Sequence, residues 1–300
     1  MKQINDIYSL LCGKERKKIA VAAAADTEVL RAVAKTRKAG IINAMLFGNS
    51  KSIVDKLEII GENPDDYEIF HCGNDLQAIE DATRAVSGET ADILMKGHVQ
   101  SSDFLRGVLN KEYGLRIQGN VLSSAAVFEI EMEGKKRLLF ITDPGFVPQP
   151  DMDTKVMMIK NTTDCLKKLG YENPRFAVLS ASEVVNPKMI SSIEAKKLEE
   201  MNREGTISGC VVGGPFSMDL AISEKSAKHK GFEHPVAGKA DVILVPSIEV
   251  GNAILKTILL LIGCPQAGFI CGTKKPVVFT SRADSAETKA NTIALAALMA

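Results

Sequence analysis

One short segment, residues 280–289, brings together a hydroxyl, a guanidinium and carboxylates. The segment follows the apolar run 276–279 and precedes a helical pattern, so Ser281 and Arg282 fall between a predicted strand end and a predicted helix start. Ligands of open α/β sheets bind at strand C-termini, and helix N-termini present free backbone N–H groups to anions. The segment therefore predicts a site for phosphate or for a developing oxyanion.

A purely structural role accounts for the same residues. Asp284 and Glu287 fit a capping-box-like helix start, and Arg282 would then form a surface ion pair. The residue types alone leave both interpretations open.

Similar chemistry follows other predicted strands. Lys96 directly follows the strand 91–95, and Arg106 lies further along the next helix, which places two fixed cations near one strand end. Ser123 and Ser124 add hydroxyls at a later junction. Lys96 taken alone is equally consistent with a structural lysine.

Two junctions in the second half of the chain combine glycine with polar side chains. Gly213-Gly214-Pro215 is followed by Asp219, and residues 249–252, which end in Asn252, are followed by Lys256. The glycines fit a role as turns equally well.

Short apolar runs alternate with amphipathic segments that tend to stop at a glycine. The predicted helices include 27–38, 51–60, 76–86, 103–110 and 285–300. The predicted strands are 18–25, 41–48, 67–72, 91–95, 120–130, 137–142, 176–180, 207–212, 242–245, 268–271 and 276–280. Strands separated by helices imply mainly parallel sheets that are covered on both faces, whereas the adjacent runs 120–130 and 137–142 predict a hairpin.

The length and the proline pattern predict two domains. The chain has 300 residues, and three prolines fall between positions 144 and 150, where neither a helix nor a central strand tolerates them. We expect a first α/β domain of 1–143 plus 285–300 and a second of 144–284. The final helix should be buried, and residues 257–273 should form a buried helix, turn and strand rather than a membrane span.

Composition excludes several classes of function. The 37 basic side chains balance 37 acidic ones, which argues against nucleic acid and membrane partners. The six cysteines are scattered and the N-terminus lacks a secretory pattern, so we expect reduced thiols and a cytoplasmic protein. Four dispersed histidines predict no metal site. The sequence also lacks GxGxxG, GxxxxGK[ST], HExxH and GxSxG motifs.

Seven segments match motifs of one known family in order and spacing. They are ADILMKGHVQSSDFLRGVLNKEYGLR (91–116), RLLFITD (137–143), SASEVVNPKM (180–189), ISGCVVGGP (207–215), VAGKAD (236–241), IEVGN (248–252) and TSRADSAETK (280–289). On these segments the chain resembles the phosphate acetyl/butyryl transferase family over essentially its whole length, and most closely the phosphate butyryltransferase branch.

The resemblance implies an enzyme that transfers a short-chain acyl group, butyryl or branched-chain, reversibly from acyl-CoA to inorganic phosphate. The products are an acyl phosphate and coenzyme A, and no tightly bound cofactor or metal is needed. It also implies two α/β domains of the isocitrate and isopropylmalate dehydrogenase-like architecture, with the active-site cleft between them, and a homodimer.

The resemblance assigns roles to particular residues. Ser281 and Arg282 match the catalytic serine and arginine, which serve the oxyanion and the phosphoryl group. Ser123 and Ser124 fall where relatives hold phosphate-binding hydroxyls, and Arg106 matches an arginine near the cleft. We expect three further residues to bind substrate: Lys96, Asn252 and Asp143.

The chain departs from the family pattern at three places. Acetyl-type relatives carry an aspartate seven residues after the serine, and this aspartate acts as the base that takes the thiol proton. This chain has Thr288 at that position, and we expect Glu287 to act as the base instead. Gly213 replaces an aspartate before Gly214-Pro215. Val147-Pro148 replaces an asparagine.

We therefore expect direct attack within a ternary complex. Four alternatives remain open at this stage: a phosphate acetyltransferase, a ping-pong mechanism through a cysteine thioester, a metal-dependent decarboxylating dehydrogenase, and a non-catalytic acyl-CoA sensor.

Overall fold

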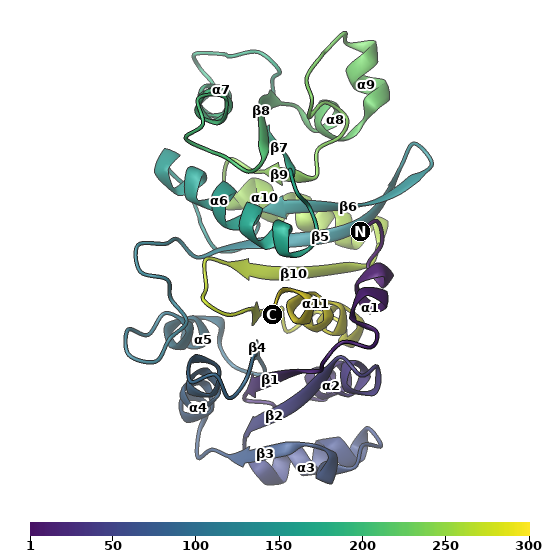
Figure 1. Cartoon of the computed structure of the whole chain (residues 1–300), viewed down its shortest axis with the longest axis vertical. Coiled ribbons are helices and arrows are strands. Elements are labelled where there is room, and N and C mark those ends of the chain that lie inside the picture. Colours follow the sequence, from purple (N-terminus) through teal and green to yellow (C-terminus); the bar gives the residue numbers. More distant parts are fainter. The chain divides into compact units, whose positions relative to one another are not determined.

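The computed structural model describes residues 1–300, which divide into two compact units (Figure 1). We call residues 5–120 and 267–300 the N-terminal unit, and residues 1–4 and 121–266 the central unit. Each unit contains its own sheet.

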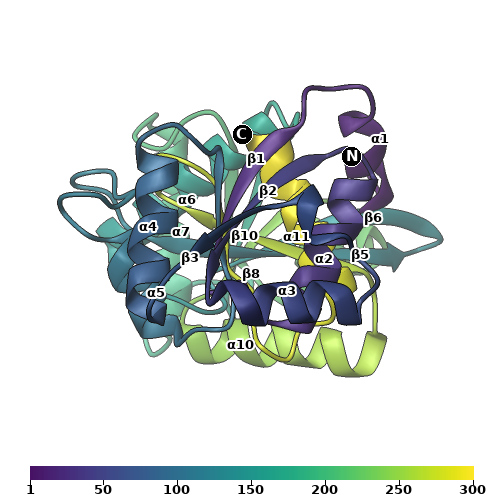
Figure 2. The same cartoon turned by 90° about the horizontal axis from the view of Figure 1, so that it is seen from below.

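The N-terminal unit has a five-stranded parallel sheet of order β11-β4-β1-β2-β3. Its strands are β1 (Lys17–Ala22), β2 (Ile42–Gly48), β3 (Glu68–His71), β4 (Ile93–Lys96) and β11 (Val277–Val278). Its helices are α1 (Asn5–Leu11), α2 (Thr27–Lys38), α3 (Ser50–Ile59), η1 (Pro64–Asp66), α4 (Asp75–Ser87), α5 (Ser101–Val108) and α11 (Ala286–Met299). Figures 1 and 2 place α4 and α5 on one face of this sheet and α2, α3 and α11 on the other.

Local sequence explains why the helices of this unit begin where they do. The side chains of Asp26, Asn49 and Asn74 each accept a hydrogen bond from a backbone N–H in the first turn of α2, α3 and α4. The predicted helix 27–38 is confirmed, and the four predicted strands before residue 96 are confirmed within a few residues. Covered on both faces, β1 and β4 are almost entirely buried.

The central unit contains β5 (Ser123–Met132), β6 (Lys135–Thr142), β7 (Arg175–Leu179), β8 (Val211–Phe216) and β9 (Val242–Leu244). The hairpin β5–β6 is antiparallel and turns at Glu133 and Gly134, which both have positive φ as a type I′ turn requires. The strands β6, β9, β7 and β8 pair in parallel. The helices are α6 (Met152–Lys168), α7 (Ile190–Arg203), α8 (Met218–Ile222), α9 (Glu224–His229), α10 (Ile248–Thr257) and the π-helical η2 (Ile258–Ile262).

The unit boundaries differ from the sequence expectation. The chain crosses between units at 4/5, at 120/121 and at 266/267, the last within β10 (Gln266–Cys271). The sequence expectation was 143/144 and 284/285. The reason lies in strand pairing: β6 pairs with β9 in the central unit, and β11 pairs with β4 in the N-terminal unit. Such long-range pairs leave no local mark in the sequence.

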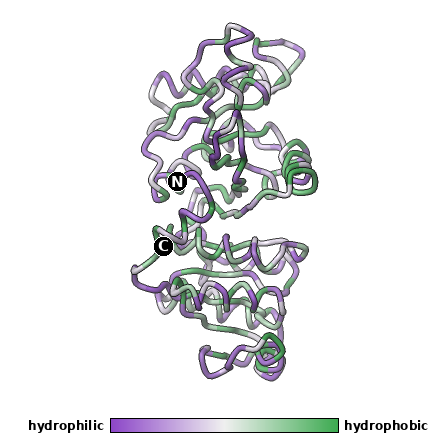
Figure 3. Tube along the Cα trace, turned by 90° about the vertical axis from the view of Figure 1, so that its right-hand side faces the viewer, coloured by the Kyte–Doolittle hydropathy of each residue, from purple (hydrophilic) through white to green (hydrophobic).

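The two apolar segments near the C-terminus behave differently. Helix α11 is buried along nearly its whole length, as predicted. The expectation that the helical part of 257–273 is buried is wrong, because Leu260, Leu261 and Ile262 are 81 %, 80 % and 63 % exposed. Hydrophobic residues alternate with hydrophilic ones along the tube in Figure 3, and none of the helices has the length and apolarity that a membrane span requires.

Gly97 follows β4 where the backbone passes against β1. Its N–H donates to the Ala22 carbonyl at 2.8 Å, and an added Cβ would lie 2.2 Å from the Ala23 carbonyl oxygen. We predict that Gly97→Ala lowers the free energy of unfolding by about 1–3 kcal/mol or more, because backbone atoms must move. Urea unfolding measures this. Gly73→Ala is the control, since its nearest atom would be the flexible end of Gln77 at 3.4 Å; equal effects of the two substitutions would contradict the packing argument.

Candidate anion-binding site

A shallow pocket in the N-terminal unit collects side chains from several chain segments. The lining residues are Asp26, Val29, Lys96, Gly97, His98, Thr280, Ser281, Arg282 and Lys289. They come from the start of α2, from the end of β4 and the loop after it, from the loop between β11 and α11, and from α11 itself. The strands β11, β4 and β1 are neighbours in a parallel sheet, so their carboxyl ends meet here. We call this the cationic pocket.

Lys96 is the unusual member of the cationic pocket. Its side chain is buried, with the residue 3 % exposed, and it forms no ion pair. Its Nζ lies 3.5 Å from the Gly97 carbonyl and 5.6 Å from the centre of the Phe279 ring. Burial lowers the pKa of the Lys96 ammonium, and the charges of Arg282 and Lys289 lower it further, against a smaller opposing effect of Asp26 and Asp284.

Lys289 fixes the loop that carries Ser281 and Arg282. The buried Lys289 ammonium donates to the carbonyl oxygens of Ser281, at 3.3 Å, and of Asp284. Asp284 Oδ2 also accepts a hydrogen bond of 2.8 Å from the Ser281 backbone N–H. The loop is thus held from both sides by charged groups, which leaves the Ser281 hydroxyl and the Arg282 guanidinium at its surface.

The contacts of residues 280–289 do not match a purely structural role as a helix cap and a surface ion pair. Helix α11 is capped by Ser285, whose hydroxyl accepts from the Thr288 N–H at 3.2 Å, and not by Asp284. The Arg282 guanidinium is exposed and makes no ion pair. An unpaired arginine beside a buried, unpaired lysine is typical of an anion-binding site.

Two predicted site residues of this unit lie outside the pocket lining. Glu287 is exposed and pairs with Lys35 of α2. Arg106, on α5, is also exposed and pairs with Asp103 at 2.8 Å. Residue types indicate the right segment for Glu287, but the direction of a side chain around a helix start depends on how that helix packs.

Asp26 and His98, for which the sequence predicts no role, lie together in the structure. Asp26 Oδ1 accepts from the Val29 N–H at 2.9 Å, and Oδ2 lies 3.3 Å from His98 Nδ1. Their adjacency depends on the pairing of β1 with β4, since the residues are far apart in the chain. The only sequence signal is a polar residue within four positions of the end of each apolar strand.

The remaining predicted residues belong to the central unit. Asp143 is buried, and its carboxylate accepts from Ser124 Oγ at 2.5 Å and from the backbone N–H groups of Ser124, Gly145 and Phe146 at 3.2, 2.8 and 2.9 Å. Burial raises the pKa of Asp143, while these donors act in the opposite direction. Asn252 Nδ2 donates to the Pro144 carbonyl at 3.4 Å, beside the same loop.

Ser123 differs from its neighbour. Its hydroxyl is completely buried and has no hydrogen-bond partner. A buried hydroxyl without a partner is uncommon in folded proteins.

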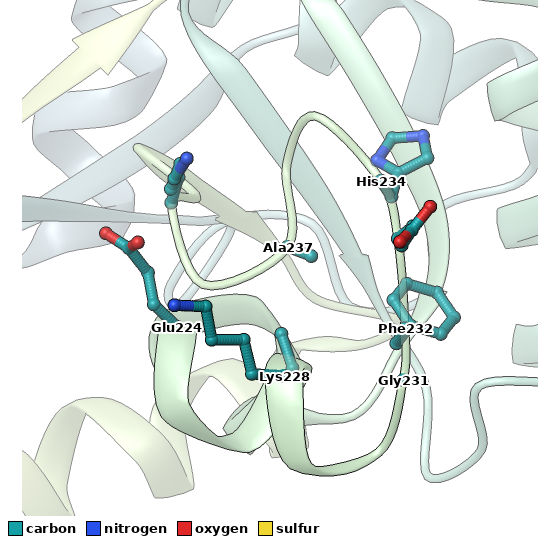
Figure 4. A pocket seen from close by; sticks show the side chains of 9 residues that line it. Glu224, Lys228, Gly231, Phe232, His234 and Ala237 are labelled. Carbon is teal, nitrogen blue, oxygen red and sulfur yellow. The ribbon is translucent and has the colours of Figure 1, made fainter.

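The central unit also contains a hollow of about 390 Å³ that the sequence did not predict (Figure 4). Glu224 and Lys228 of α9 lie on one side of it, and Phe232 and His234 on the other. Burial lowers the pKa of His234, and its Nδ1 accepts from the Val236 N–H at 3.1 Å. No group of three or more His, Cys, Asp or Glu side chains anywhere in residues 1–300 is arranged to hold a metal ion.

Comparison with known proteins decides the family. The family model described as Phosphate acetyl/butaryl transferase matches residues 66–297. The chain belongs to this family. It is 46 % identical, over all of its own length and 99 % of the relative, to the phosphate butyryltransferase of Clostridium acetobutylicum. It is 41 % identical, over 95 % of each chain, to the phosphate acetyltransferase of Thermotoga maritima.

Solved structures agree with the family assignment. A branched-chain phosphotransacylase from Enterococcus faecalis matches with a TM-score of 0.85 at 30 % identity, over 94 % of this chain and 98 % of that one. A 4-hydroxythreonine-4-phosphate dehydrogenase from Klebsiella pneumoniae matches with a TM-score of 0.54 at 14 % identity, over 93 % of this chain and 98 % of that one, which indicates a shared fold alone. The predicted family and the predicted α/β class with mainly parallel sheets are confirmed.

The buried charge of Lys96 leads to a test of anion binding. Because its pKa is lowered in the folded state, Lys96 disfavours folding in the absence of a counter-charge, and that cost diminishes as pH rises and the ammonium loses its proton. We predict that Lys96→Met maintains or raises the melting temperature without ligand and removes most of the increase that inorganic phosphate produces. At a phosphate concentration of 100 times its Kd, that increase corresponds to about 2.7 kcal/mol in the original protein.

Thermal unfolding at a series of phosphate concentrations measures both effects. Lys35→Met is the matched control, because Lys35 is a surface lysine of the same unit and pairs with Glu287 outside the pocket lining. A full phosphate response in Lys96→Met would show that the ion binds elsewhere.

Proposed function

We propose that this protein transfers a short-chain acyl group reversibly between coenzyme A and inorganic phosphate. The observation that carries the proposal is the cationic pocket, where the buried Lys96 ammonium and the Arg282 guanidinium both lack a carboxylate partner. Phosphate would supply the missing negative charge. Full-length similarity to a phosphate butyryltransferase supports the same reaction.

In the proposed reaction, a phosphate oxygen attacks the thioester carbonyl within a ternary complex. The new C–O bond forms, the carbonyl oxygen becomes negative, and collapse of this intermediate breaks the C–S bond and releases the thiolate. Arg282 and the Ser281 hydroxyl stabilise the oxyanion, a role in which one donor contributes about 3 kcal/mol. Lys96 neutralises phosphate, and binding both substrates together supplies about 7–11 kcal/mol of the barrier.

Further residues are assigned to substrate from the family resemblance. Ser123 is assigned to phosphate because it falls where relatives hold a phosphate-binding hydroxyl. Ser124 is assigned a supporting role, since its hydroxyl already donates to Asp143. Arg106 and Asn252 remain proposed substrate contacts, and none of these assignments requires a metal or a tightly bound cofactor.

A covalent route through cysteine has little support. Burial raises the pKa of Cys72, Cys210 and Cys264, which opposes formation of the thiolate that such a route needs. No cysteine lines the cationic pocket. We therefore propose direct transfer.

The preferred acyl group is proposed from the relatives. A phosphate butyryltransferase at 46 % identity and a branched-chain phosphotransacylase at 30 % favour a four- or five-carbon chain. Phosphate acetyltransferase is the second candidate, because a relative of that name is 41 % identical. One methylene changes transition-state binding by only about 1–3 kcal/mol, so selectivity should be graded.

We also propose a homodimer in the cytoplasm. The six cysteines form no disulfide bond, which is consistent with a reducing compartment. Leu260, Leu261 and Ile262 form an exposed apolar cluster in η2, directly after α10. Packing of a second copy of the chain against this cluster would remove it from water.

Release of coenzyme A from a series of acyl-CoA substrates, with and without phosphate, tests the activity. We predict phosphate-dependent thiol release that is faster with butyryl- or isobutyryl-CoA than with acetyl-CoA. Arg282→Ala should lower kcat/KM by at least about 100-fold, as expected for loss of an oxyanion donor. Arg203→Ala, on the exposed end of α7, serves as the control. Coenzyme A binding without any phosphate-dependent release would instead identify a sensor.

Sedimentation velocity tests the dimer. We predict that the original protein sediments as a dimer and that the double variant Leu260→Ser, Leu261→Ser shifts toward the monomer at equal concentration, because two exposed apolar side chains are replaced by polar ones. Ile59→Ser, at an exposed position of the N-terminal unit, should not change the distribution. An unchanged dimer in the double variant would place the interface elsewhere.

A further inference from the structure

The reaction above needs a group that exchanges a proton with the coenzyme A sulfur, and Glu287 does not line the pocket. A thiol with a pKa of about 8.5 is only a few per cent ionised at neutral pH. A proton acceptor beside the cationic pocket would therefore raise the concentration of the nucleophile. Such an acceptor must line the pocket and carry a free lone pair.

His98 meets this requirement. Its side chain is 57 % exposed and lines the pocket together with Ser281 and Arg282. Its backbone N–H donates to the Ala23 carbonyl at 2.9 Å, which fixes the residue against the end of β1. No hydrogen bond occupies Nε2, so this atom is open to solvent or substrate.

Asp26 orients the ring of His98. One carboxylate oxygen of Asp26 is held by the Val29 N–H at the start of α2, and the other lies 3.3 Å from His98 Nδ1. A carboxylate at this distance favours the tautomer with the proton on Nδ1 and leaves the lone pair on Nε2. It also stabilises the imidazolium once Nε2 has accepted a proton, which is how an aspartate supports a catalytic histidine in acyl transfer.

The other titratable groups of the pocket are less suited to this role. Arg282 and Lys289 are cations without a free lone pair, and Lys96 is already assigned to phosphate. Tyr8 does not line the pocket, its pKa is raised by burial, and its hydroxyl already donates to Asn291. The Asp284 carboxylate lies beside Ser281, but it accepts the Ser281 backbone N–H and is not part of the pocket lining.

From this geometry we propose that His98 is the catalytic group that moves the thiol proton and that Asp26 is its positioning residue. This inference rests on the proposed acyl transfer. In the direction that consumes acyl phosphate, the S–H proton passes to His98 Nε2 and the thiolate attacks the carbonyl carbon. The C–S bond forms, and the bond between the acyl carbon and the bridging oxygen of the acyl phosphate breaks. The electron pair of the broken bond leaves with the phosphate. In the opposite direction the departing thiolate recovers the proton from the imidazolium.

Steady-state kinetics of butyryl phosphate with coenzyme A over pH 6–9 test this assignment in the full-length protein. His98→Gln should lower kcat by about 100-fold with little change in the KM for butyryl phosphate, in line with loss of a general base. The pH profile of kcat should change, because the coenzyme A thiol must then lose its proton to solvent. The residual rate should instead rise in proportion to the thiolate fraction up to about pH 8.5.

Asp26→Asn provides a second, independent variant. Asparagine still caps α2 but carries no charge, so folding is retained. Loss of the carboxylate removes the group beside His98 Nδ1. The pH profile of kcat should therefore change, and kcat should fall by less than in His98→Gln, with little change in the KM for butyryl phosphate. His71→Gln, a histidine of the same unit that contacts Ser50, should leave the profile unchanged.

The outcomes separate this inference from the proposed function. If the original protein performs the transfer and His98→Gln or Asp26→Asn retains its rate and pH profile, the assignment to His98 is overturned and the acyltransferase stands. If the original protein releases no coenzyme A with any acyl group, the proposed function itself fails. Circular dichroism shows whether His98→Gln is folded, and the pH profile of Asp26→Asn decides the matter if it is not.

Discussion

The central physical constraint in this protein is a lysine ammonium that is removed from water without receiving a counter-charge. Burial of an unpaired charge costs several kcal/mol, and proteins usually offset that cost with a carboxylate. Lys96 has none, and its nearest charged neighbours include the cations Arg282 and Lys289. A bound anion would supply the missing charge, so this local instability accounts for the chemistry that we assign to the site.

The rest of the N-terminal unit can be understood as the frame for this arrangement. Parallel pairing in the order β11-β4-β1 brings three chain segments to one edge of the sheet, although they are separated by up to 260 residues or so. Gly97 allows the backbone after β4 to pass close to the end of β1. Lys289 holds the loop after β11 through a hydrogen bond to the Ser281 carbonyl. In the central unit the Asp143 carboxylate organises the loop after β6 in a comparable way, through four hydrogen bonds.

Reasoning from the sequence predicts the features of this structure that depend on local pattern. Hydropathy patterns predict the alternation of strands and helices and the burial of α11. Residue types near strand ends indicate Lys96, Ser281 and Arg282 as candidate site residues. It could not reach Asp26 and His98, whose contact requires knowing that β1 lies beside β4. It also directed attention to Glu287, which the packing of α11 against α2 turns toward Lys35. The exposed Leu260 and Leu261 show the same limit, because an apolar run does not reveal what covers it.

A crystal structure of the protein with phosphate and coenzyme A bound would test the central claim most directly. The account predicts a phosphate ion within hydrogen-bond distance of both the Lys96 ammonium and the Arg282 guanidinium, with the sulfur of coenzyme A nearby. An ordered phosphate bound only at another place, with Lys96 still lacking an anionic partner, would contradict it.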